Sequence, residues 1–186
     1  MTGTWRLHGY TLMNIALLVL RLVVGLTFVA HAAPKLFMVF GGRGIQGTAD
    51  AFDQIGLRPS RVNAWLAALA ELGGGLLIAL GLLTPIAAAA LIAVMTAATL
   101  TVHLRNGFFA TNNGYEYNLV LAVAAFALAG IGPGEWSLDN ALGIHMAGAW
   151  WAVGALGGGV LGGLGAVLSG RLTSERGPGR GQPDAA

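Results

Sequence analysis

The chain has 186 residues, of which 55% are hydrophobic and only 10% are charged. Soluble domains carry about 25% charged residues, so this composition excludes an ordinary soluble fold and is typical of a membrane protein. The net charge is +2 and the basic residues are scattered, which excludes a nucleic-acid-binding patch. There is no cysteine, which excludes disulfides, thiolate metal sites and covalent haem. A redox role therefore needs a bound cofactor or another subunit.

The first long apolar stretch carries an arginine in its middle. Residues 12–33 are long enough to cross a bilayer, since about 20 residues at about 1.5 Å each span the hydrocarbon. Arg21 lies inside this stretch, and a charge at that depth needs an internal partner or water. Helical spacing places the following residues on one face: Arg21, Gly25, Phe28, Ala32 and Lys35, with His31 beside them.

A long connection and three further apolar stretches follow. Residues 48–56 predict a short helix on the membrane surface, which Gly56 ends. The next spans are expected over about 63–83, 85–104 and 116–131. Glu71 lies inside the first of them, His103 near the end of the second, and Glu116 at the start of the third. Residues 1–145 thus predict an all-α membrane bundle with four core helices.

The region after the fourth span is apolar and rich in glycine. Residues 146–168 predict a fifth transmembrane helix, and the alternative is a mobile apolar tail. Gly154, Gly158 and Gly162 recur at four-residue spacing, a pattern that favours close helix packing or self-association. Residues 169–186 are polar and predict disorder.

The distribution of Lys and Arg favours five spans. With five, one side of the membrane carries only Arg6, whereas with four the tail changes sides and the bias nearly disappears. The positive-inside rule then places the N-terminus outside and the 36–62 connection in the cytoplasm. The cytoplasmic side carries Lys35, Arg43, Arg58, Arg61, Arg105, Arg171, Arg176 and Arg180.

The intramembrane charges predict a polar site. Counted from the nearest helix ends, Arg21 is about 18 Å deep and Glu71 about 12 Å deep below the same surface, so an Arg21–Glu71 pair is expected. The predicted site consists of Arg21, His31, Lys35, Glu71, His103 and Glu116. The alternative is that the Arg21–Glu71 pair only fixes helix register.

Metal binding and nucleotide binding have less support in the sequence. The spacing of His31 and His103 matches no metal motif, so no metal site is expected, whereas proton transfer by a histidine remains an alternative. Gly42-Arg-Gly44-Ile-Gln-Gly47 matches a dinucleotide-binding pattern but follows a membrane helix, not a strand. Nucleotide binding is therefore not expected.

Several short motifs in their order resemble the DoxX family. They are Arg21 with Gly25, His31-Ala-Ala-Pro-Lys35, Glu71-Leu-Gly-Gly-Gly, Gly81-Leu-Leu-Thr-Pro85, His103, Glu116 and Gly132-Pro-Gly-Glu-Trp-Ser-Leu-Asp139. The family usually has a glycine ahead of its lysine, where this chain has Ala33-Pro34. The resemblance implies four transmembrane helices in the bacterial plasma membrane. The wider group includes a membrane subunit of a thiosulfate:quinone oxidoreductase.

Three functions remain open at this stage. The first is a membrane component of a redox-linked complex that binds a quinone at the polar site, with another subunit supplying electrons. The second is a non-catalytic anchor or scaffold for soluble partners. The third is a carrier of a small solute or protons. In the first case the chain is at most an oxidoreductase subunit.

Overall fold

The structure, a computed structural model, describes residues 3–174, and within that range it is helical with no strand. The described α-helices are α1 (Gly3–Phe37), α2 (Gly44–Gln54), α3 (Ser60–Leu80), α4 (Thr84–Ala98), α5 (Glu116–Ile131), α6 (Leu138–Ala141) and α7 (Ala149–Ser174). A π-helical turn, Thr99–His103, extends α4. The all-α bundle predicted from the sequence, with a fifth long helix after the core, is confirmed.

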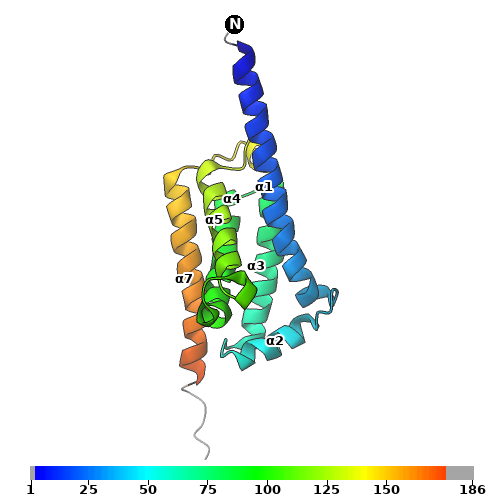
Figure 1. Cartoon of the computed structure of the whole chain (residues 1–186), viewed down its shortest axis with the longest axis vertical. Coiled ribbons are helices and arrows are strands. Elements are labelled where there is room, and N and C mark those ends of the chain that lie inside the picture. The colour runs from blue at the N-terminus through cyan, green and yellow to red at the C-terminus, as the bar shows by residue number, and fades with distance from the viewer. Residues whose placement is uncertain (1–2, 175–186) are drawn as a thin grey trace, which may run out of the picture.

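The helices α1, α3, α4, α5 and α7 run side by side, and α2 lies across one end of them (Figure 1). α4 packs against α3, α5 and α7, while α1 packs mainly against α3. The chain starts at the opposite end from α2, and α7 finishes near α2 (Figure 1). Below, the two ends of the bundle are called the N-terminal end and the α2 end.

Within residues 3–174, four helical segments are long and apolar enough to cross a membrane, and α5 is a shorter apolar helix. The four segments are Tyr10–Phe37, Ser60–Leu80, Thr84–Asn106 and Ala149–Gly170. Large apolar side chains cover their outer surfaces, such as Val23 on α1, which is 61% exposed. An outer surface of this kind is suited to lipid and not to water.

Two helices are longer than the sequence predicts. α1 continues through Pro34 to Phe37 instead of ending near residue 33. α7 reaches Ser174, so residues 169–174 are helical and the prediction of disorder there is wrong. The rest of the predicted disordered tail, residues 175–186, lies outside the described residues.

Glycine allows α1 and α3 to touch backbone to backbone. A Cβ on Gly25 would collide with the carbonyl oxygen of Gly75, and a Cβ on Gly75 would lie 2.6 Å from the carbonyl oxygen of Gly25. Phe28 packs beside this crossing and is 1% exposed. The crossing fixes how residues of α1 align with residues of α3, and therefore positions every polar side chain between them.

The glycines of α7 serve two different faces. Gly159 and Gly163 pack against α4, where an added Cβ would lie 2.6 Å from Ile92 and Thr96 side-chain atoms respectively. Gly154 and Gly158 instead have open space around their Cβ positions. Close packing of α7 on α4 therefore depends on Gly159 and Gly163, which are not among the glycines that the four-residue spacing had indicated.

Candidate functional site

Glu71 forms an ion pair with Lys35 near the α2 end. The Lys35 Nζ lies 2.6 Å from Glu71 Oε2 and also donates to the His31 carbonyl oxygen at 2.7 Å. The Glu71 side chain is 7% exposed and that of Lys35 is 21% exposed. The last turn of α1 thus supplies the charge that compensates a buried carboxylate on α3.

His31 lies beside this pair but faces the outside of the bundle. Its Nε2 is 3.4 Å from the Tyr117 hydroxyl on α5, and the two rings lie 6.0 Å apart at a tilt of 50°. His31 and Tyr117 therefore connect α1 to α5 near the Lys35–Glu71 pair.

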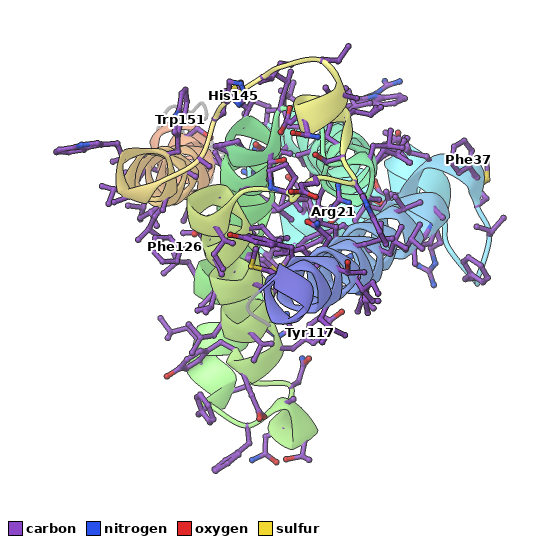
Figure 2. All side chains as sticks on the ribbon, turned by 90° about the horizontal axis from the view of Figure 1, so that it is seen from above. Arg21, Phe37, Tyr117, Phe126, His145 and Trp151 are labelled. Atoms are coloured by element: carbon purple, nitrogen blue, oxygen red, sulfur yellow. The ribbon has the colours of Figure 1, made fainter. Side chains whose placement is uncertain are left out.

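The predicted Arg21–Glu71 pair is wrong. Arg21 is 1% exposed and donates through Nη2 to the Trp136 carbonyl oxygen, at the N-terminal end. Its Nη1 packs where a Cβ of Gly81 would lie. Arg21 lies inside the bundle, whereas Phe37 and Trp151 point outward (Figure 2). Its surroundings are therefore separate from those of Glu71.

Asp139 is the acidic residue near Arg21. Its Oδ1 accepts from the Leu83 N–H at 2.8 Å, and its Oδ2 accepts from the Thr84 N–H at 3.1 Å and the Thr84 hydroxyl at 2.8 Å. Asp139 therefore satisfies the free N–H groups at the start of α4, as a capping side chain does. The sequence offered only its position in the motif after α5, and the deep burial, with 1% exposure, was not predictable from that.

Hydrogen bonds also join the motif at residues 132–139 to α1. Asn14 on α1 donates through Nδ2 to Glu135 at 2.8 Å and accepts from the Glu135 N–H at 3.0 Å. Together, Asn14, Arg21, Thr84, Glu135 and Asp139 form what is called below the N-terminal cluster. Its contacts mainly join the 132–139 segment to α1 and to the turn between α3 and α4.

His103 ends the π-helical turn after α4 and Glu116 begins α5, so the two residues flank the loop between these helices. The His103 Nδ1 lies 2.8 Å from the Asn113 carbonyl oxygen, and Glu116 Oε2 accepts from the Ala110 N–H at 2.9 Å. These contacts order the loop locally. Of the six predicted site residues, the structure brings His31, Lys35 and Glu71 together and gives the other three separate partners.

A cavity of about 400 Å³ lies against the Lys35–Glu71 pair. Its walls come from the four long helices α1, α3, α4 and α7, the end of α2 with the residues after it, and the π-helical turn. It is lined by Lys35, Phe52, Ile55, Leu57, Asn63, Leu66, Ala67, Ala70, Glu71, Ala90, Ala93, Val94, Ala97, Ala98, Thr101, Val102, Gly162, Gly163 and Ala166. Its size and mostly apolar lining are typical of a small-molecule site.

Asn63 gives the cavity a hydrogen-bond donor. It is 6% exposed, and its Nδ2 has no hydrogen-bond partner within the described part of the chain. An unsatisfied buried amide costs free energy, so a ligand that accepts a hydrogen bond there gains affinity. Sequence reasoning placed Asn63 only at a helix start. An amide side chain in the first turns of an otherwise apolar helix was the signal that could have identified it.

Comparison with known proteins identifies the family. The DoxX family model matches residues 16–104. The chain is 34% identical over 117 residues to "Putative oxidoreductase CatD" of Bacillus subtilis, covering 63% of this chain and 81% of that protein. The chain belongs to the DoxX family. It is also 32% identical over 133 residues to "Uncharacterized membrane protein Rv3486" of Mycobacterium tuberculosis, covering 66% of this chain and 78% of the relative. No solved structure matches it.

Family and fold together make this DoxX chain a multi-pass membrane protein. The matched region includes Lys35, Glu71 and Asn63, but ends before α5 and α7. Part of the cavity wall, formed by Gly162, Gly163 and Ala166, therefore lies outside the region that the family model describes.

Proposed function

We propose that this DoxX protein is a quinone-binding membrane component of a redox-linked complex in the bacterial plasma membrane. The observation that carries the proposal is the cavity, which combines an apolar lining with two N–H donors and one carboxylate. The donors are Asn63 Nδ2 and Lys35 Nζ, and the carboxylate is Glu71.

A quinone fits this donor set chemically. A para-quinone has a carbonyl acceptor at each end of an apolar ring, so two donors on one cavity suit it. The Asn63 amide needs an acceptor, and the Lys35 ammonium has a third hydrogen beyond those used by Glu71 and His31. When bound, the quinone supplies two-electron, two-proton redox chemistry.

The residues of the cavity then have distinct tasks. Asn63 and Lys35 would hold the quinone by donating hydrogen bonds to its carbonyl oxygens. Glu71, which lines the cavity and contacts the partly exposed Lys35, would exchange protons at the cavity wall. The apolar walls exclude water from the ring.

Electrons must come from a partner subunit. The chain contains no cysteine, so it holds no thiolate-bound cluster of its own. The name of one relative includes oxidoreductase, which agrees with a role in a redox assembly. We expect the partner to carry the reducing cofactor and to bind at the α2 end, close to Glu71.

The proposal is tested by purification from native membranes in a mild detergent, followed by quantification of bound quinone. Wild-type protein should retain close to one quinone per chain, whereas Asn63→Leu should retain at least tenfold less. Asn106→Leu is the matched control, because Asn106 does not line the cavity and its amide donates to the backbone oxygens of Val102 and Asn113. Equal, substoichiometric quinone in all three proteins would refute quinone binding.

A scaffold function is the second candidate, and one surface favours it. After α1, the chain exposes four apolar residues in a row: Phe37, Met38, Val39 and Phe40, of which Phe40 is 85% exposed. Met38 and Phe40 have positive φ values of 55° and 54°, so this turn holds their side chains outward at a conformational cost. Exchange of residues 37–43 should abolish recovery of soluble partners while leaving bound quinone unchanged. Loss of quinone together with partners would instead favour a single redox role.

A further inference from the structure

We infer that the cavity opens sideways into the bilayer between α3 and α7, and that the apolar tail of the quinone-class ligand enters through this opening. The inference rests on the proposed function, because the head of the ligand is taken to lie at Asn63 and Lys35. It adds an entry path, and it makes α7 a wall of the binding site.

The arrangement of three helices creates the opening. α3 and α7 each pack against α4, but they have few contacts with each other within the described residues. Seen from above, α7 and α3 lie on either side of α4 (Figure 2). At the α2 end the Ser169 hydroxyl donates to the Arg58 carbonyl oxygen at 3.0 Å, which joins α7 to the connection before α3. The gap is therefore bridged toward the α2 end and open along the side.

Residues on both edges of the gap face the cavity and the outside at once. Leu66 on α3 lines the cavity and is 59% exposed. Gly162 on α7 also lines the cavity and is exposed. In a membrane, these exposed surfaces contact lipid tails, so an apolar chain can pass between them without meeting water. The opening therefore suits the tail and not the polar head.

The gap between α3 and α7 is deep because the α4 residues at its base have small side chains. On α4 the floor includes Ala90, Ala93 and Ala97, which span about 10 Å at 1.5 Å per residue. An apolar space of this kind does not hold water well, because water needs polar partners. A hydrocarbon chain instead gains dispersion contacts with the alanines and glycines.

Gly162 and Gly163 have different tasks at this wall. A Cβ on Gly163 would lie 2.6 Å from the Thr96 Cβ, so Gly163 is needed for helix packing. A Cβ on Gly162 would lie 3.4 Å from the Ala93 Cβ, an ordinary contact, so a larger side chain there fills the opening without separating the helices. Gly162 is thus the position at which the opening can be blocked.

The experiment uses a quinone with a photoreactive diazirine at the end of its tail, added to full-length protein in lipid nanodiscs. Cross-linked residues are mapped by mass spectrometry in wild type, Gly162→Leu and Gly165→Leu. Gly165 lies on the same helix with open space around its Cβ position, which makes it a matched control. We expect labels on α3 and α7 in wild type, a loss of at least tenfold in Gly162→Leu, and a change below twofold in Gly165→Leu. Thermal unfolding confirms that both variants are folded, and Ala166→Leu serves as a second block.

Labelling that survives both Gly162→Leu and Ala166→Leu, or that avoids α7, overturns the inference. Labelling by a diazirine-tailed phospholipid that excess quinone does not displace also overturns it, since the occupant is then a lipid. Quinone retained at Asn63 without tail labelling on α7 overturns the entry path and leaves the proposed function standing. Labelling that Gly162→Leu blocks, without any quinone reduction by a partner, supports the entry path and counts against the redox role.

Discussion

Lys35 Nζ lies 2.6 Å from Glu71 Oε2, while the guanidinium of Arg21 lies beyond the α1–α3 crossing. Arg21 comes four residues before Gly25, and Glu71 comes four residues before Gly75. Because α1 and α3 run antiparallel, these offsets point in opposite directions, which separates the two residues by about 12 Å along the helix axes. The crossing thus divides the polar residues into a cavity site and the N-terminal cluster.

The Lys35–Glu71 pair should behave as a coupled unit. Lys35→Met leaves a buried carboxylate without its partner, and Glu71→Gln leaves an ammonium without its counter-charge, so each single variant should unfold more easily. The double variant should be less unstable than the sum of the two, with a coupling free energy of about 1–3 kcal/mol. Unfolding in detergent, followed by circular dichroism, measures the cycle. Strict additivity would show that the two side chains do not interact.

The crossing of α1 and α3 should tolerate no side chain at Gly75. Gly75→Leu forces the two backbones apart, and we expect a loss of about 3 kcal/mol, the upper end of the range of about 1–3 kcal/mol for overpacking, because the atoms in the way belong to the backbone. Gly73→Leu is the control, since the Cβ position of Gly73 is open. Thermal unfolding of the two variants should differ clearly. A Gly75→Leu variant as stable as Gly73→Leu would show that the Gly25–Gly75 contact does not set the alignment of α1 with α3.

Much of the fold was predictable because apolar length and helical periodicity report it directly. The α1 face with Arg21, Gly25, Phe28 and Ala32 was predicted, and all four residues are buried. The pairing of charges was not predictable, since it depends on where α1 ends and which glycines meet. α1 continues through Pro34, and the Gly25–Gly75 contact sets which residues of α1 and α3 meet. Neither feature follows from the helical periodicity of the sequence. The cavity was missed for a similar reason, because it lies between α7 and two helices far away in the sequence.

Asp139 should matter more for stability than its place in the short helix α6 indicates. Asp139→Ala removes the acceptor of two N–H groups at the start of α4 and of the Thr84 hydroxyl, and it leaves Arg21 without its nearby acid. Loss of such buried acceptors costs about 1–3 kcal/mol each when donors remain unsatisfied. The exposed acid Asp53, which pairs with Arg58, provides the control Asp53→Ala, with an expected change within about 0.5 kcal/mol. Similar unfolding temperatures for the two variants would contradict the capping role.

The orientation in the membrane can be tested with single cysteines, because the chain has none of its own. The positive-inside rule places α2 and the loop before α5 in the cytoplasm. In intact cells, a membrane-impermeant maleimide should label Ala141→Cys and leave Asp50→Cys and Thr111→Cys unlabelled until the cells are opened. All three positions are exposed, so access does not limit labelling. The reverse pattern would invert the topology and place the α2 end outside.

Arg21 should support the fold and not the ligand. Arg21→Met removes the hydrogen bond to Trp136 and a charge near Asp139, so the variant should unfold at a lower temperature. The cavity lining does not include Arg21, and therefore the protein that remains folded should bind quinone as wild type does. Lys35→Met, although it also destabilises the fold, should reduce quinone retention at least tenfold in the protein that remains folded. Quinone retention measured per folded chain separates the two effects, and a loss with Arg21→Met equal to that with Lys35→Met would mean that the N-terminal cluster and the cavity act as one site.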